Sequence, residues 1–168
     1  MGLHTVQDVL KEQLEDLHSA ETQLVEALPK MAKAAHHDEL REAFEHHLEE
    51  TRGHVKRVEE ALGELGVTSP SETCKGMQGL IAEGEELLQK EGDPNAKDAA
   101  LIGAAQRVEH YEIAAYGTAR QLADDADLSG IRDLMDQTLD EESQADKLLT
   151  KIATGGMFKS GVNEQAAG

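Results

Sequence analysis

The stretch His46-His47-Leu48-Glu49-Glu50-Thr51-Arg52-Gly53-His54 places polar side chains at positions where a helix normally carries apolar ones. The apolar residues on both sides of it recur every three or four residues, which is typical of an amphipathic helix. In this register His47, Thr51 and His54 face the core, and Glu50 lies one turn before His54. A carboxylate and an imidazole one turn apart can bind a transition-metal ion, although an acidic helix rich in histidine also contains such pairs by chance. We therefore expect a site only if other helices bring matching groups to the same depth.

The composition of the 168-residue chain favours one helical domain with a sizeable core. Two Phe and two Tyr are its only aromatic residues, so aliphatic side chains must fill the core, which favours close-packed helices over a sheet. The formal net charge of −18 argues against binding to nucleic acid or to anionic membrane surfaces, because both require a basic patch. No apolar run approaches the roughly 18 residues of a membrane span.

The cellular compartment is predicted from two further features. Cys74 is the only cysteine, which excludes an intrachain disulfide and fits a reducing compartment. The N-terminal residues show no charged segment followed by an apolar run, so no secretory signal is evident. We expect a cytoplasmic protein.

The apolar pattern predicts four long helices and one shorter helix, at residues 6–35, 39–62, 70–91, 94–123 and 131–154. Ser69-Pro70-Ser71-Glu72 and Asp93-Pro94 are strong helix starts, since each has a capping residue followed by proline. Pro29 lies within the first segment, where we expect a kink, with a loop as the alternative. Cys74 falls in the first turn of the shorter helix, and we assign it no role.

The connections between the predicted helices indicate the topology. The first two long helices are joined by a short connection, as are the last two, so each pair should form an antiparallel hairpin. A long crossover that carries the shorter helix joins the hairpins, which is the connectivity of ferritin-like folds. The prediction is an all-α, ferritin-like four-helix bundle over residues 1–156, followed by a flexible tail over residues 157–168.

The two hairpins carry matching acidic residues at similar positions. Glu21 and Glu50 are separated along the chain by nearly the same distance as Glu112 and Glu142. So many acidic groups can share a dry core only if they bind cations or hold protons. The candidate metal ligands are Glu21, Glu50, His54, Glu109, Glu112, Glu142 and Asp146. In the last helix, alignment with Leu48-Glu49-Glu50 favours Glu141, whereas the inward apolar stripe favours Glu142, which we choose.

Four segments of the sequence resemble the YciE/YciF family of ferritin-like stress proteins. They are Leu14-Glu15-Asp16-Leu17, His47-Leu48-Glu49-Glu50-Thr51, Cys74-Lys75-Gly76-Met77 and Thr138-Leu139-Asp140-Glu141-Glu142. The resemblance extends over residues 5 to about 155. It implies a ferritin-like bundle, commonly a homodimer, with a dinuclear iron site, but the activity of this family is poorly defined.

The candidate site departs from the usual di-iron pattern, in which Glu and His lie three residues apart on two of the helices. Here Glu50 and His54 are one residue further apart, and the partner of Glu142 is Asp146 instead of His. A carboxylate-rich site of this kind should hold two Fe ions, with Mn as an alternative, and should disfavour Zn. His47 also faces inward, and we interpret it as a core histidine satisfied by a carboxylate.

Three hypotheses for the function follow. The first is a di-iron carboxylate protein, bridged by Glu50 and Glu142, that oxidises Fe(II) or reduces peroxide during stress, with metal ions and O₂ or peroxide as its partners. The second is a non-catalytic bundle that acts as a stress-induced homodimeric interaction or structural module. The third is a bundle whose carboxylates share protons instead of binding metal. Hydrolase and nucleotide-binding motifs are absent from the sequence.

Overall fold

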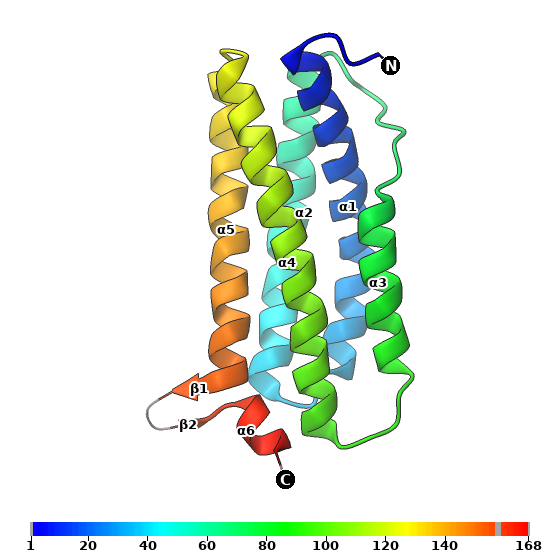
Figure 1. Ribbon diagram of the computed structural model, residues 1–168, viewed down its shortest axis with the longest axis vertical. Coiled ribbons are helices and arrows are strands. Elements are labelled where there is room, and N and C mark those ends of the chain that lie inside the picture. The colour runs from blue at the N-terminus through cyan, green and yellow to red at the C-terminus, as the bar shows by residue number, and fades with distance from the viewer. Residues whose placement is uncertain (1, 157–158, 168) are drawn as a thin grey trace.

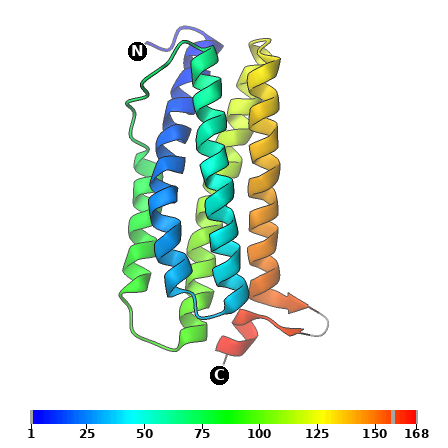
Figure 2. The same ribbon diagram turned by 180° about the vertical axis from the view of Figure 1, so that it is seen from behind.

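Four long helices lie side by side, and a shorter helix lies against them (Figures 1 and 2). The computed structural model describes residues 2–156 and 159–167. The helices of the bundle are α1 (Val6–Ala34), α2 (Asp38–Glu64), α3 (Lys75–Leu88), α4 (Pro94–Asp125) and α5 (Ser129–Thr154). This arrangement confirms the predicted all-α, ferritin-like bundle with a shorter helix in the long crossover.

The connections between helices match the predicted topology. α1 and α2 form one hairpin, and α4 and α5 form the other. The segment between α2 and α4 runs back along the bundle, so that α2 and α4 point in the same direction (Figure 1). α3 is part of this segment and packs against α1 and α4. The inner faces of all four long helices are thereby directed at one shared core.

Several helix boundaries follow from local capping. Thr5 Oγ1 accepts a hydrogen bond from Asp8 N (3.1 Å), and Asp8 Oδ2 accepts one from Thr5 N (2.9 Å), which is a complete capping box. Asp93 Oδ1 accepts hydrogen bonds from the first amides of α4 and is followed by Pro94 at the first helical position. Pro29 lies within α1, which continues to Ala34, so the loop alternative is wrong.

The start of α3 differs from the prediction. The helix begins at Lys75 instead of near Ser69, and Cys74 is its N-cap. The backbone N–H of Cys74 donates to Ser19 Oγ (3.0 Å), and its carbonyl oxygen accepts from Gln23 Nε2 (3.2 Å). These contacts with α1 hold Cys74 in an extended conformation. Tertiary hydrogen bonds have therefore overridden the local start signal.

The described residues of the predicted flexible tail contain secondary structure that the sequence did not predict. β1 (Gly155–Gly156) pairs antiparallel with β2 (Lys159–Ser160), and α6 (Val162–Ala166) then packs against α4 and α5. Val162 is only 1% exposed and belongs to the core, which explains why this segment is held in place. Positions 157–158 and 168 of the predicted tail lie outside the described residues.

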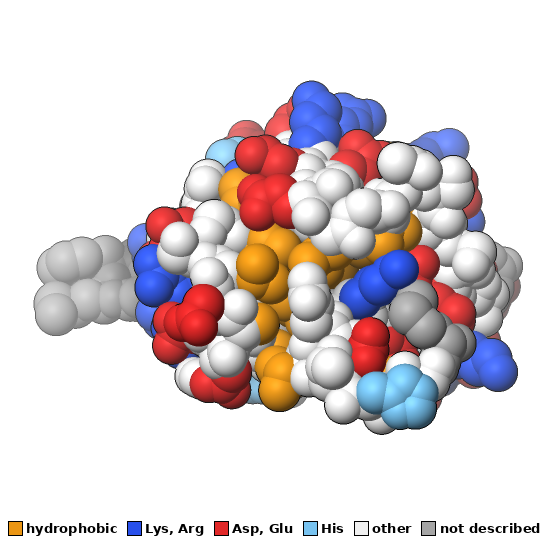
Figure 3. All heavy atoms as spheres, turned by 90° about the horizontal axis from the view of Figure 1, so that it is seen from above, with side chains coloured by type: hydrophobic (Ala, Val, Ile, Leu, Met, Phe, Trp, Pro, Cys, Tyr) orange, Lys and Arg blue, Asp and Glu red, His pale blue; other side chains and the backbone are white. Residues whose placement is uncertain are grey.

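The core consists of two apolar clusters with a polar belt between them. The cluster near the N-terminal end includes Leu10, Leu14, Val58 and Ile131, and charged side chains surround the apolar ones at this end (Figure 3). The other cluster is built around residues such as Leu28, Leu40, Phe44, Leu101 and Ile152. The buried polar residues of the belt are Glu21, His47, Thr51, His54, Glu109, Glu112, Thr138 and Glu142. None of the helices in the described ranges combines the length and apolarity needed to cross a membrane.

Candidate metal centre

Each long helix contributes to the polar belt. Glu21 comes from α1, His47 and His54 from α2, Glu109 and Glu112 from α4, and Glu142 from α5. His47 and His54 are two turns apart, and Glu109 and Glu112 are one turn apart, so helical periodicity places each pair on one face. All six side chains are buried. The belt therefore collects carboxylates and imidazoles from all four helices.

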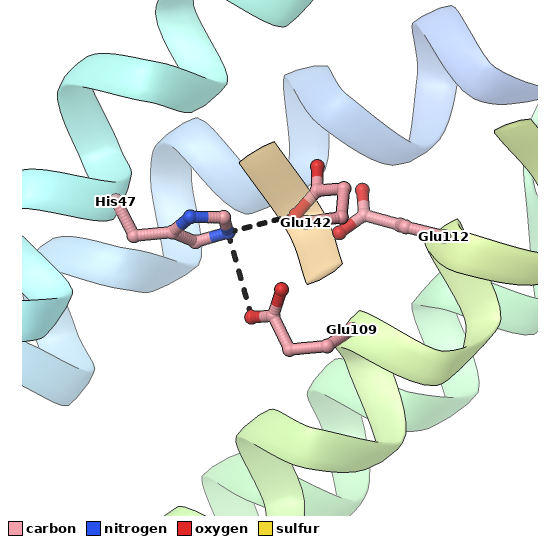
Figure 4. Close-up of side chains that lie close together, drawn as sticks. All are labelled: His47, Glu109, Glu112 and Glu142. Carbon is pink, nitrogen blue, oxygen red and sulfur yellow. Dashed lines mark ion pairs between the residues drawn. The ribbon is translucent and has the colours of Figure 1, made fainter. Parts of the chain in front are cut away.

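The first ligand group consists of His47, Glu109, Glu112 and Glu142 (Figure 4). One ligand atom from each residue lies within 4.8 Å of the ligand atoms of the other three. Nε2 of His47 lies 3.4 Å from Glu109 Oε1 and 3.5 Å from Glu142 Oε2. The three carboxylates and the imidazole point toward one another, which is the arrangement that a divalent cation requires.

The second ligand group consists of Glu21, His54 and Glu142. Nδ1 of His54 lies 3.3 Å from Glu21 Oε1 and 2.9 Å from Glu142 Oε1. Glu142 thus belongs to both groups, with Oε1 near His54 and Oε2 near His47. A carboxylate placed in this way can bridge two metal ions. We name the first group the His47 group and the second group the His54 group.

Each histidine is oriented by a carboxylate on its other ring nitrogen. Nδ1 of His47 lies in hydrogen-bonding geometry 3.3 Å from Glu50 Oε2, and Nε2 of His54 lies 2.9 Å from Glu141 Oε2. Glu141 is itself paired with Arg57, which also donates from Nε to Thr138 Oγ1 (2.9 Å). Carboxylates in this position fix the ring orientation and the tautomer of a metal-binding histidine.

The inner polar atoms of the belt fit a cation. Within the described part of the chain, eight of them have no hydrogen-bond partner: Glu21 Oε2, His47 Nε2, His54 Nδ1, Glu109 Oε2 and both carboxylate oxygens of Glu112 and Glu142. His54 Nδ1 and Glu142 Oε1 still form an ion pair at 2.9 Å, but an atom that has neither kind of partner costs about 1–3 kcal/mol when it is buried. Asp98 is also buried, but its two oxygens accept from the backbone N–H groups of His36 (2.9 Å) and His37 (2.7 Å). The protein itself supplies hydrogen-bond donors to Asp98 but not to these belt atoms, so the belt requires a cation or protons.

The electrostatics of the belt lead to the same conclusion. Burial raises the pKa of Glu112 well above its ordinary range, and the nearby charges of Glu21 and Glu142 raise it further. Burial also raises the pKa of Glu109. Burial alone would lower the pKa of His54, but Glu142 and Glu21 raise it to about 10. Without a metal, the belt reduces its negative charge by holding protons, whereas two divalent ions would balance its four carboxylates with both imidazoles neutral.

Comparison with known families matches residues 5–167 to a domain of unknown function, DUF892. The chain belongs to the DUF892 family. It is 39% identical to the protein YciF of Escherichia coli (strain K12) over 165 residues, which are 98% of this chain and 99% of YciF. This match confirms the resemblance to the YciE/YciF proteins that the sequence motifs indicated.

Two solved structures also match this DUF892 chain closely. The crystal structure of the Escherichia coli stress protein YciF has a TM-score of 0.85 and 40% identity, over 89% of this chain and 94% of that chain. YcfI from Rhodopseudomonas palustris has a TM-score of 0.86 and 35% identity, over 89% of this chain and 96% of that chain. The bundle described above is therefore shared with these relatives.

The structure brings together most of the ligands that we predicted for this DUF892 protein. Those in the two groups are Glu21, His54, Glu109, Glu112 and Glu142. Glu142 occupies the shared position, and Glu141 orients His54 instead. Asp146 lies in neither group. Its side chain is partly exposed, Gln106 Nε2 donates to it (3.0 Å), and exposed His110 pairs with it (3.2 Å).

Glu50 and His47 exchange the roles that we predicted for them. Glu50 lies in neither group, and its carboxylate contacts the outer nitrogen of His47. His47, which we interpreted as a core histidine, points Nε2 into the belt. Its inward position on the helix was visible in the sequence, as was its spacing of two turns from His54. The carboxylates that surround it on α4 and α5 were not.

The two tyrosines differ in their relation to the belt. The hydroxyl of buried Tyr116 donates to Glu21 Oε1 (2.5 Å) and so holds a ligand of the His54 group. The hydroxyl of Tyr111 donates to Asp16 Oδ2 (2.8 Å) and lies 3.0 Å from Cys74 Sγ. Tyr111 therefore ties α4 to α1 and to the start of α3, and only Tyr116 contacts a residue of the two ligand groups.

Proposed function

We propose that the protein binds two divalent metal ions, iron or manganese, in the belt and uses them in redox reactions with O₂ or peroxide. The observation that carries this proposal is the pair of ligand groups joined through Glu142, whose inner atoms lack hydrogen-bond partners in the described chain. Carboxylates and imidazoles are suitable ligands for both metals. The acidic surface of the protein would attract the cations.

The roles of the protein residues follow from their positions. His47, Glu109 and Glu112 would hold one ion, Glu21 and His54 would hold the other, and Glu142 would give one oxygen to each. The bound ions would supply the electrons that O₂ or peroxide accepts. Glu50 and Glu141 hold the two imidazoles in position, and Tyr116 keeps its hydroxyl proton against Glu21. The apolar clusters on both sides of the belt limit the access of water.

The description of one relative supports a role in stress. The Escherichia coli relative is described as a stress protein. Protection against oxygen species, by oxidising Fe(II) or reducing peroxide, would suit a stress protein that carries a redox-active centre. We also propose that the protein acts in the cytoplasm as a homodimer, as its composition and its family resemblance led us to expect.

Elemental analysis of the purified protein tests metal binding. We expect about two metal ions per chain, as a dinuclear site requires, and the loss of both in Glu142→Gln, because both groups share this residue. Asp140→Asn is the matched control, since it neutralises an exposed carboxylate on the same helix. A metal-free protein whose thermal unfolding is unaffected by Fe(II), Mn(II) and Zn(II) would disprove the proposal.

Turnover requires a separate measurement on the loaded protein. The rate of Fe(II) oxidation under O₂ or peroxide should exceed that of the Glu142→Gln variant under the same conditions. Two bound ions without such turnover would indicate a structural metal centre and would contradict the redox part of the proposal.

A further inference from the structure

A cavity of about 230 Å³ leads from the surface to the His47 group. Its lining includes His46, Glu50, Gln144 and Ala145, and also His47 and Glu109 of the ligand group. A wider surface hollow shares Ala43, His46 and Leu148 with this cavity, so the two lie next to each other. Glu21 and His54 are fully buried and are not part of the lining. The cavity therefore reaches one of the two ligand groups.

Polar atoms follow one another along this cavity at decreasing exposure. His46 Nε2 lies 3.3 Å from Glu50 Oε1, and Glu50 Oε2 lies 3.3 Å from His47 Nδ1. Nε2 of His47 then lies 3.4 Å from Glu109 Oε1. The side chains of these four residues are 69%, 25%, 7% and 4% exposed, in that order. At the inner end, His47 Nε2 and Glu109 Oε2 have no hydrogen-bond partner in the described chain.

We propose that this cavity is the route by which divalent cations reach the belt, and that Glu50 is the residue that takes the ion from solvent and transfers it to the His47 group. This inference rests on the proposed metal binding. A hydrated cation cannot enter a dry core without replacing its water ligands, because the desolvation cost is large. A half-buried carboxylate offers replacement ligands midway along the route. Its negative charge also raises the local concentration of cations.

The wider hollow gives ions access to the cavity, but its lining does not favour cations over anions. Its lining includes Glu39 and Glu42 but also Lys151 and Lys159, and Lys159 is paired with Glu39. The charge that favours a cation therefore belongs to the inner cavity, where Glu50 is the carboxylate nearest to the solvent. Glu50 differs from the six residues of the two ligand groups in this respect, since they are all buried.

Metal loading of the metal-free protein, followed with Co(II) by stopped-flow absorption, tests the role of Glu50. In Glu50→Gln we expect loading of the His47 group to slow about tenfold, a typical effect of losing electrostatic focusing. The number of ions bound at equilibrium should not change. Glutamine keeps an oxygen that can accept from His47 Nδ1–H, so the imidazole stays oriented. Glu49→Gln is the matched control, because Glu49 is exposed, adjacent on the same helix and not part of the lining.

Narrowing the cavity without changing its charge tests the route itself. Ala145→Leu should also slow loading, whereas Ala114→Leu, at an exposed position on α4, should not. If the wild type binds Co(II) but both cavity variants load at its rate, the route is disproved while the metal centre stands. If Glu50→Gln binds fewer ions at equilibrium, Glu50 is a permanent ligand and the transfer role is wrong. If the wild type binds no ion, the proposed function fails and this inference fails with it.

Discussion

The His47 group and the His54 group are built from similar residues but differ in their access to solvent. The His47 group borders a cavity, and the carboxylate that orients its imidazole, Glu50, is partly exposed. In the His54 group, Glu21 and His54 are fully buried. Tyr116 donates a hydrogen bond to Glu21, and Glu141, which is paired with Arg57, contacts His54. Two matching helical hairpins have thus produced an open ligand group and an enclosed one. We expect the open group to exchange its ion readily and the enclosed group to retain it.

The largest expected effect concerns the residue that joins the two groups. Glu142→Gln should abolish the stabilisation of the protein by metal at both groups. That stabilisation is about 4 kcal/mol per group when the free metal is 1,000-fold above its Kd. In the metal-free state the variant should unfold at a lower temperature than the wild type, because the buried ion pair between Glu142 Oε1 and His54 Nδ1 (2.9 Å) is lost. Thermal unfolding with and without Mn(II) measures both effects, and equal metal-induced shifts in variant and wild type would contradict the bridge.

Single-group variants should separate the open group from the enclosed one. Glu109→Gln should weaken metal binding at the His47 group and leave the His54 group able to bind. The loss of metal-induced stabilisation should be about half of that expected for Glu142→Gln. Glu21→Gln should do the reverse. Isothermal titration with Mn(II) should show one remaining site in each variant. The loss of both sites in either variant would mean that the groups do not bind independently.

A smaller effect concerns how stability depends on pH. The metal-free protein should become less stable as the pH rises, whereas the loaded protein should become more stable. The pKa of His54 is about 10 in the folded state, so its contribution to stability is full below its ordinary value of 6.5 and is lost as the pH rises through about 10. The raised pKa values of Glu109 and Glu112 act in the same direction from their ordinary value of 4.5 upward. Metal binding displaces these protons, so the loaded protein should become more stable as the pH rises.

Melting temperatures at several pH values between about 5 and 10, with and without Mn(II), measure this divergence. Burial alone would lower the pKa of His47, but Glu109 and Glu50 raise it above 6.5 as well, so the change above pH 6.5 comes from both ligand groups. Parallel curves for the metal-free and loaded proteins would contradict the assignment of these residues as ligands.

The smallest expected effect concerns the support behind the enclosed group. Tyr116→Phe removes the hydrogen bond to Glu21 Oε1 and leaves that oxygen without its donor, at a cost of about 1–3 kcal/mol. Affinity at the His54 group should fall about tenfold, a usual result of losing a residue that positions a ligand, while the His47 group should be unchanged. Tyr111→Phe is the control, since Tyr111 contacts Asp16 and Cys74. Equal losses of affinity in the two variants would show that the effect is not specific to Glu21.

The sequence predicted the helices well where local chemistry controls them. The Asp93-Pro94 start is present in the structure, because its cap uses backbone groups within one turn. The start of α3 was predicted wrongly, because Ser19 and Gln23 on another helix hold Cys74 extended. The sequence also did not indicate that Val162 is buried, since this burial depends on contact with distant parts of the chain.

By itself, the sequence determined that the protein is a helical bundle with a long crossover and that acidic groups and histidines face its interior. Helical periodicity is enough for that, since it assigns each side chain to a face of its helix. Only the tertiary structure decided that His47 enters the ligand group, that Glu50 stays at its edge and that Glu142 is shared. Convergence within 4.8 Å depends on how far each helix is shifted and rotated against its neighbours. That alignment is set by the packing of the apolar clusters on either side of the belt, which no single helix contains.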